Sequence, residues 1–257
     1  MGTLIGVTLY ARTVAEAKHA FTAAYQRCAA LNQILSDYEP ASEVSRLGLE
    51  PRPVSAELYR VLAFARTVSQ ASNGAFDVTI GPLSRLWRQR LPLTAAARAL
   101  VDWREVHLAE GTVRLGKPGM RLDLGAIGKG FAADEMLLIL KDLGITRALI
   151  AASGDIVCGD SPPGHRGWSV RAASRRILLR HGAVSTSGDT TQYFEKDGRR
   201  FSHILDPRTG ESVTDVIEVA VTARNGITAD ALSTAVRLVG RSAARSLLTR
   251  FQAKLLG

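Results

Sequence analysis

The sequence predicts an α+β fold in which long amphipathic helices cover one side of a largely antiparallel sheet. Two observations carry this prediction. Short strand-like stretches are separated by hairpin turns, and apolar residues at spacings of three and four mark a few long helices. No Pro- or Ser-rich linker divides the chain, so a single domain over 1–257 is expected. The order strand, long helix, strands occurs in about 1–146 and again in 147–257, which suggests two pseudo-repeated halves.

The first half is expected to contain two long helices among short strands. Thr13 and Glu16 have the spacing of a capping box, and an apolar stripe over 17–35 marks the first helix. Ser55 caps the second helix, which ends at Asn73-Gly74. Strands are expected at 4–10, 76–80, 106–108, 112–115 and 120–124, the last three as an antiparallel meander.

A third helix, whose apolar face covers 132–143 and which ends at Gly144, is expected to close the first half. Two closing helices are expected to start near Thr228 and Ser242. Strands are expected at 147–152, 168–170, 177–180, 183–186 and 217–222, with a hairpin turn at Asp197-Gly198.

Composition excludes several classes of protein. The chain has 46% hydrophobic and 22% charged residues, which is ordinary globular usage. Its longest apolar stretches, such as 136–140 and 148–152, fall far short of the roughly 18 residues that a membrane-spanning helix needs. Cys28 and Cys158 are the only cysteines, which excludes a disulfide scaffold and, with five scattered histidines, argues against a four-ligand zinc site.

The net charge of +9 favours anionic partners such as phosphates, nucleic acid or an acidic membrane surface. The sequence has no basic run with interleaved aromatic residues and no nucleic-acid-binding module, so no nucleic-acid partner is expected. No secretory signal precedes the first strand. The expectation is therefore either a cytoplasmic protein or the mature form of an exported one that has lost its N-terminal segment.

A glycine-rich segment, Leu122 to Gly130, runs from an expected strand into an expected helix. Its backbone amides and Lys129 can gather at a helix N-terminus, where a phosphate is favoured. The segment is neither a Walker A loop nor a G-x-G-x-x-G motif. From the residues alone, a phosphate site and a plain strand-to-helix turn with a solvated lysine are equally well supported.

Asp230 and Thr234 are four residues apart in an expected helix, so both oxygen-bearing side chains point to one face. Hard oxygen ligands suit Mg²⁺ or Ca²⁺, and Mg²⁺ needs few protein oxygens when water and substrate phosphate complete its shell. Asp in a first helical turn and Thr bonded to the carbonyl four residues earlier also occur for structural reasons alone. The residues alone favour that structural interpretation.

The segment Ser202 to Gly210 concentrates His203, Asp206 and Arg208 beside a Pro/Gly turn. A histidine at a strand end can act as a general base, and arginine can hold phosphate oxygens. The alternative is a turn stabilised by its own side chains, with His203 packed beside it. Two further turns, 153–155 and 184–189, offer hydroxyl groups, glycines and a carboxylate each, and are open to the same two interpretations.

The combination of these motifs resembles the ApbE family of FAD:protein FMN transferases. The matching segments follow the family's order over essentially the whole chain: 1–3, 36–38, 42–47, 74–83, 122–130, 153–155, 185–189, 203–210 and 229–235. The resemblance implies a tandem pair of T-fold-like α+β units.

The resemblance also implies a magnesium-dependent bacterial enzyme that cleaves FAD, releases AMP and attaches FMN through a phosphoester to a Ser or Thr of another protein. It implies Mg²⁺ ligands at the carbonyl of Ala126 and the side chains of Asp230 and Thr234. FAD contacts are implied at Met1, Tyr38, Ala75, Phe76, Asp77, Asp123, Lys129 and Ile204.

Attack by a neutral hydroxyl needs a proton acceptor. His203 is the expected base, since the ordinary pKa of imidazole is about 6.5, and Asp206 is the fallback. Four positions depart from the family pattern and leave acceptor recognition and the identity of the base open: Gly48, Ser153, Thr190 and Ser202.

Two alternatives to the transferase stay open from the sequence. One is a Mg²⁺-dependent FAD pyrophosphatase that gives FMN and AMP, and the other is a flavin-binding protein without turnover. The resemblance places the protein in the bacterial periplasm or at the outer face of the inner membrane, with respiratory or envelope redox proteins as flavin acceptors. Membrane attachment is expected only through an N-terminal anchor that has been lost.

Overall fold

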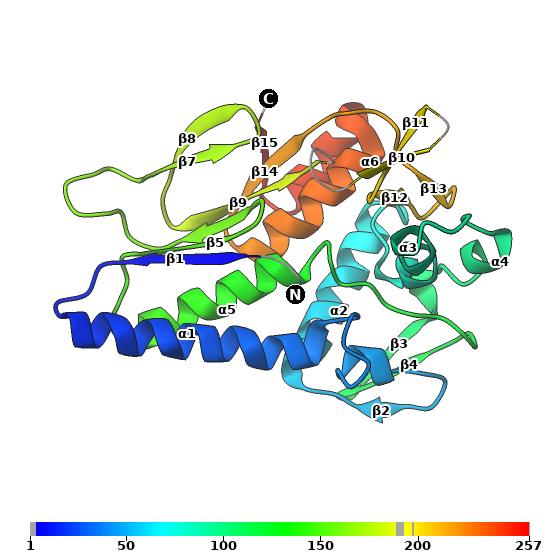
Figure 1. Ribbon diagram of the computed structural model, residues 1–257, viewed down its shortest axis with the longest axis horizontal. Coiled ribbons are helices and arrows are strands. Elements are labelled where there is room, and N and C mark those ends of the chain that lie inside the picture. Colours follow the sequence, from blue (N-terminus) through cyan, green and yellow to red (C-terminus); the bar gives the residue numbers. More distant parts are fainter. Residues whose placement is uncertain (1–3, 189–192, 197, 257) are drawn as a thin grey trace.

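A six-stranded antiparallel sheet forms the centre of the computed structural model, which describes residues 4–188, 193–196 and 198–256 (Figure 1). Every paired strand in it runs antiparallel to its neighbours. The first strand of the chain pairs with the strand at 148–152, so the two halves of the sequence share one sheet. In spatial order the strands are β1 (Ile5–Leu9), β5 (Ala148–Ala152), β6 (Asp155–Cys158), β9 (Gly182–Ser187), β14 (Val219–Ala223) and β15 (Lys254–Leu256).

Three long helices cover one face of this sheet. Helices α5 (Gly128–Asp142) and α6 (Gly226–Arg250) pack directly on the strands and on each other, and α1 (Val14–Leu35) packs on α5 as an outer layer (Figure 1). Met136 and Leu140 of α5 meet Ile150 of β5 in a core without solvent contact. The burial of alternate residues in β5 follows from the period of two along a strand.

The hairpin of β7 (Trp168–Ala172) and β8 (Arg175–Leu179) covers the opposite face of the sheet. Trp168 and Leu179 pack there against Cys158 and Val184 from the central strands. The middle strands of the sheet, β6 and β9, are therefore covered on both faces.

A second group of elements follows β1 and α1 in the chain and lies to the right in Figure 1. It contains α2 (Ala56–Ala71), α3 (Gly81–Arg88), α4 (Ala95–Arg98) and a three-stranded sheet with the order β2-β4-β3. Leu58 and Leu62 of α2 belong to a core that also includes Leu232 of α6, so the group is packed on the closing helix. The remaining short elements are β2 (Arg52–Pro53), β3 (Val106–Ala109), β4 (Thr112–Leu115), β10 (Tyr193–Lys196), β11 (Arg199–Ser202), β12 (Leu205–Asp206), β13 (Glu211–Ser212) and the 3₁₀ turns at Val44–Arg46, Val78–Ile80 and Trp103–Glu105.

The predicted helix starts are confirmed. Thr13 caps α1 by accepting a hydrogen bond from the amide of Glu16, and Ser55 caps α2 by accepting one from Leu58. The Glu16 carboxylate bonds the amide of Arg12, one residue before the position expected in a capping box. Strands β10 and β11 form the predicted hairpin, whose Gly198 has a φ of 70°, while Asp197 lies outside the described residues.

The predicted strand at 76–80 is wrong. The segment forms a 3₁₀ turn over Val78–Ile80 that leads straight into α3. Asp77 accepts hydrogen bonds from the amide and hydroxyl of Thr79, which closes the turn, and Pro82 stands in the first turn of the helix, where its missing amide costs nothing. This side-chain capping overrides the alternation of apolar residues.

One further expectation needs correction. The segment 120–124 forms no strand, and β4 pairs instead with β2 and β3, because the chain at 48–54 returns alongside it. The two predicted closing helices are confirmed, since α6 consists of two helical segments that meet in a kink at Gly240, whose φ of 79° only glycine adopts readily. Among the described residues, no helix has the length and apolar character needed to cross a bilayer.

Candidate functional site

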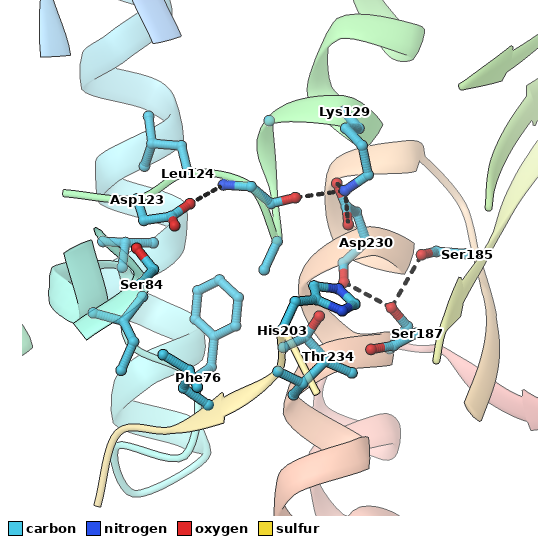
Figure 2. Close-up of a pocket in the computed structure, with 18 of the residues that line it drawn as sticks. Phe76, Ser84, Asp123, Leu124, Lys129, Ser185, Ser187, His203, Asp230 and Thr234 are labelled. Carbon is cyan, nitrogen blue, oxygen red and sulfur yellow. Dashed lines mark hydrogen bonds and ion pairs between the residues drawn. The ribbon is translucent and has the colours of Figure 1, made fainter. Parts of the chain in front are cut away.

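A cavity of about 310 Å³ lies where the N-terminal ends of α5 and α6 meet the loop after α1 and the segment around α3 (Figure 2). Its wall is completed by the ends of β9 and of the hairpin that leads to His203. The residues come from segments that are far apart in the sequence.

Most of the predicted site residues line this one cavity. Met1 lies outside the described residues, and Asp206 does not line the cavity. Those that do are Tyr38, Ala75, Phe76, Asp77, Asp123, Ala126, Lys129, His203, Ile204, Asp230 and Thr234.

One lysine and two buried carboxylates form the centre of the site. The Nζ atom of Lys129 lies 3.3 Å from Asp155 Oδ2 and 3.3 Å from Asp230 Oδ1. Both aspartates are only 2% exposed. Figure 2 shows Lys129 and Asp230 pointing toward each other across the helix ends. The sequence analysis noted Asp155 only as part of a turn, because nothing local places it beside Lys129.

The charges of this centre influence one another strongly. Burial raises the pKa of Asp230, Asp155 raises it further, and the opposing effect of Lys129 leaves it at about 7. For Lys129, burial lowers the pKa, but Asp155 and Asp230 outweigh burial and raise it above its ordinary value. Lys129 therefore stays protonated at neutral pH, whereas the raised pKa of Asp230 leaves its carboxyl group only partly ionised at that pH.

The donor set suits a hard divalent cation. Asp155 Oδ2 is buried and receives no well-directed hydrogen bond, although Lys129 lies 3.3 Å away. The Asp230 carboxylate, the Thr234 side chain and Ala126 line the same cavity and offer oxygen atoms only. The described part of the chain has no group of three or more His, Cys, Asp or Glu suited to a metal ion. A cation here would therefore need hydroxyl and carbonyl ligands beside the carboxylates.

Two glycines allow the helix ends to approach this closely. A Cβ atom on Gly130 would lie 2.1 Å from the carbonyl oxygen of Gly226, and one on Gly226 would lie 2.4 Å from that of Gly130. The close approach lets the amide of Gly130 donate to Asp230 Oδ2 at 2.9 Å. The glycine-rich segment thus serves helix packing as well as a possible anion site.

Arg88 organises the opposite wall of the cavity. Its guanidinium donates at 2.6 Å to Asp37 and at 2.6 Å to Asp123, and it lies 4.0 Å from the centre of the Tyr38 ring. Asp123 in turn accepts from the amide of Gly125 at 2.8 Å. Arg88 therefore ties the loop after α1 to the glycine-rich turn. The sequence analysis missed it because these partners are distant along the chain.

Some residues predicted to contact FAD lie at the mouth of the cavity, and others form or support its wall. Tyr38 is 64% exposed at the cavity mouth, whereas Phe76 is 2% exposed and forms part of the wall. The two carboxylate oxygens of Asp77 accept hydrogen bonds from Thr79 and from the amide of Trp103. Asp77 therefore shapes the turn that presents Phe76.

The two candidate bases lie in different environments. His203 lines the cavity and meets the Trp87 ring edge-on, with the ring centres 6.2 Å apart. The Asp206 carboxylate instead accepts from the backbone and side chain of Arg208, at 2.7 to 3.0 Å. Burial raises the pKa of Asp206, but the Arg208 hydrogen bonds outweigh burial and lower it, which makes Asp206 a poor proton acceptor at neutral pH.

Hydroxyl groups of β9 and α6 support the acidic end of the site. The Oγ atoms of Ser185 in β9 and Ser233 in α6 lie 3.0 Å apart, and Ser233 donates to the carbonyl oxygen of Asp230. Ser153, which departs from the family pattern, has a φ of 59°. That conformation favours glycine, which gives a physical reason for glycine at this position in the pattern.

A model of the ApbE family matches residues 1–256. The chain belongs to the ApbE family. The FAD:protein FMN transferase of Treponema pallidum (strain Nichols) is 33% identical over 289 residues, which cover 98% of this chain and 80% of the relative. The FAD:protein FMN transferase of Klebsiella pneumoniae (strain 342) is 27% identical over 276 residues, with 96% and 79% covered.

Solved structures of the ApbE family share the fold. The flavin transferase ApbE from Vibrio cholerae matches with a TM-score of 0.87 at 26% identity, covering 100% of this chain and 90% of that chain. The ApbE protein from Thermotoga maritima matches with a TM-score of 0.89 at 28% identity, covering 99% and 90%. The predicted α+β fold is confirmed, and the protein is a transferase.

Proposed function

We propose that this transferase takes FMN from FAD and attaches it to a hydroxyl group of an acceptor protein, with release of AMP. The observation that carries the proposal is the cluster of Lys129 with the buried Asp155 and Asp230 at the end of a cavity with an aromatic mouth. A dinucleotide diphosphate needs positive charge, which Lys129 and a cation held by the carboxylates would supply, and a flavin needs flat apolar surface. The names of the relatives, FAD:protein FMN transferases, support the same reaction.

The bond changes follow from the chemistry of a diphosphate. The acceptor Ser or Thr oxygen forms a bond to the FMN phosphorus, and the bond from that phosphorus to the bridging oxygen breaks. AMP leaves with the electron pair. We assign the hydroxyl proton to His203, which lines the cavity, rather than to Asp206, which Arg208 holds.

The chain's own residues bind and orient the substrate in this proposal. Lys129 supplies a fixed positive charge beside the diphosphate, and the Tyr38 ring, held by Arg88, covers the flavin at the cavity mouth. Mg²⁺ held by Asp230, Thr234 and the Ala126 carbonyl would neutralise charge that builds on the diphosphate. The Asp155 Oδ2 atom, which is buried and accepts no hydrogen bond, supports that assignment.

The acceptor is proposed to be a redox protein with a target Ser or Thr, in the bacterial periplasm or at the outer face of the inner membrane. The net charge of +9 favours an acidic acceptor surface.

The test is the intact mass of an acceptor protein after incubation with FAD and Mg²⁺. The expected product carries FMN that survives denaturation, and equimolar AMP is released. Omitting Mg²⁺ or replacing Asp230 with Asn should abolish transfer, whereas Asp142→Asn, at an exposed carboxylate at the other end of α5, should leave it unchanged. Release of free FMN and AMP with no mass gain on any acceptor would contradict the transferase and favour the pyrophosphatase.

A further inference from the structure

The N-terminal ends of α5 and α6 begin with the same residue pattern. Residues 130–134 read Gly-Phe-Ala-Ala-Asp, and residues 226–230 read Gly-Ile-Thr-Ala-Asp. The two glycines are in direct contact, since a Cβ on either would collide with the carbonyl oxygen of the other. The equivalent aspartates, Asp134 and Asp230, each lie four residues after their glycine. The two helix starts therefore meet as near-equivalent partners.

Each aspartate bonds the first turn of the other helix. Asp230 of α6 accepts from the amide of Gly130 at 2.9 Å. Asp134 of α5 accepts from the amide of Gly226 at 2.6 Å and from that of Ile227 at 2.9 Å. These amides lie in first helical turns, where the chain offers no acceptor from the same helix. Negative charge at both helix starts is also favoured by the helix dipoles.

Only one of the two helix starts carries the chemistry of the site. Lys129 precedes Gly130, but Asn225 precedes Gly226. Thr234 follows Asp230 by four residues, whereas the residue at the same distance from Asp134 is Leu138, which is 49% exposed. Asp134 lines a separate open hollow, whose lining shares no residue with the cavity of the site. Asp134 therefore has no direct access to a substrate in that cavity.

We propose that Asp134 is a positioning residue for the transfer reaction, because it fixes the start of α6 on α5 and so places Asp230 and Thr234 relative to Lys129. The expected effect of Asp134 on catalysis rests on the proposed function. Its expected effect on the position of α6 rests on the reciprocal hydrogen bonds alone. Without Asp134, every remaining side-chain hydrogen bond that the described residues make between the two helix starts would involve Asp230. Asp230 is the residue that the cation also needs.

The test compares Asp134→Asn and Asp134→Ala with Ser55→Ala. Asn keeps the shape but presents an amide group to one of the two donors, and Ala removes both acceptors. Ser55→Ala removes the cap of α2, which costs about 1 kcal/mol, and Ser55 itself hydrogen-bonds to Glu43 and Leu58, neither of which belongs to α5 or α6. It is the control for a loss of stability alone.

Three readouts decide the outcome: kcat for FMN transfer, the Mg²⁺ affinity measured calorimetrically with FAD present, and amide hydrogen exchange. Both Asp134 variants should lower kcat and Mg²⁺ affinity by roughly 10- to 100-fold, as supporting residues of metal sites do. Exchange should accelerate at Gly226 and Ile227 and also at Gly130. Ser55→Ala should change none of the three.

Two results would overturn the inference: wild-type kcat and Mg²⁺ affinity in both Asp134 variants, or faster exchange confined to Gly226 and Ile227 with Gly130 unaffected. If the wild type itself neither binds Mg²⁺ nor transfers FMN, the proposed function fails. The exchange at Gly130 then decides alone whether Asp134 positions Asp230. If the Asp134→Ala chain does not fold, the Asp134→Asn chain supplies the comparison.

Discussion

At the scale of single residues, the site contains groups that are proposed to act on substrate and groups that hold other residues in place. Lys129, Asp155 and Asp230 concentrate charge where little solvent reaches. Arg88 and Asp77 have their polar atoms occupied by the protein, so they shape the walls. Residue type alone does not distinguish these roles, whereas hydrogen-bond partners do.

In the proposed mechanism, the proton transfer depends on His203. Replacing it with Ala should lower kcat for FMN transfer by roughly 10²- to 10⁴-fold, the usual contribution of a general base, with little change in FAD affinity. Single-turnover kinetics with saturating FAD and Mg²⁺ measure the change. His107→Ala, at a half-exposed histidine of β3 outside the cavity lining, is the matched control. Transfer at the wild-type rate by His203→Ala would remove His203 from the mechanism.

Asp206 should contribute to stability rather than to catalysis. Its carboxyl group has a lowered pKa in the folded protein, so its ionised form stabilises the fold above the ordinary pKa of about 3.9. This stability is lost as pH falls through the folded pKa. The free energy of unfolding of the wild type relative to Asp206→Asn should therefore decrease between pH 5 and pH 3, as measured by urea unfolding. A difference that stays constant or grows toward low pH would contradict this account.

At the scale of elements, the contact between α5 and α6 is the part of the fold that assembles the site. It brings the glycine-rich turn, which sequence analysis identified, to the Asp230 and Thr234 pair, which sequence analysis also identified. The helix caps at Thr13 and Ser55 were predictable because their partners lie three residues away. The sequence could not reveal the contacts of Arg88, Asp134 and Asp155, because their partners lie far away along the chain.

The close contact between α5 and α6 can be tested with two glycine variants, one inside the contact and one beside it. Gly130→Ala should destabilise the protein by at least the ~1–3 kcal/mol typical of overpacking and reduce FMN transfer, because its Cβ would meet backbone atoms of α6. Gly128→Ala places its Cβ at an ordinary 3.8 Å from Leu124 and should be tolerated. Thermal unfolding and transfer assays of the two variants measure the contrast. Equal stability in both would show that the contact is loose.

At the scale of the whole molecule, the fold class was predicted correctly, whereas two of the expected strands do not form. Alternating and helical periodicities identified the central sheet and its long helices, because those elements are buried on defined faces. The strand expected at 76–80 does not form because the Asp77 side chain caps a 3₁₀ turn there. The strand expected at 120–124 does not form because β2, which is distant in the sequence, pairs with β4 instead. The division into two pseudo-repeated halves stays a prediction, and the matching starts of α5 and α6 support it.

The central claim is that one divalent cation binds between α5 and α6 against the diphosphate of FAD. Anomalous diffraction from crystals grown with FAD and Mn²⁺, a substitute for Mg²⁺ with a usable signal, tests it most directly. The account predicts a Mn²⁺ peak within bonding distance of the Asp230 carboxylate, the Thr234 hydroxyl and the Ala126 carbonyl, with diphosphate oxygens completing its shell. Clear density for FAD with no Mn²⁺ peak at these three oxygens would contradict it.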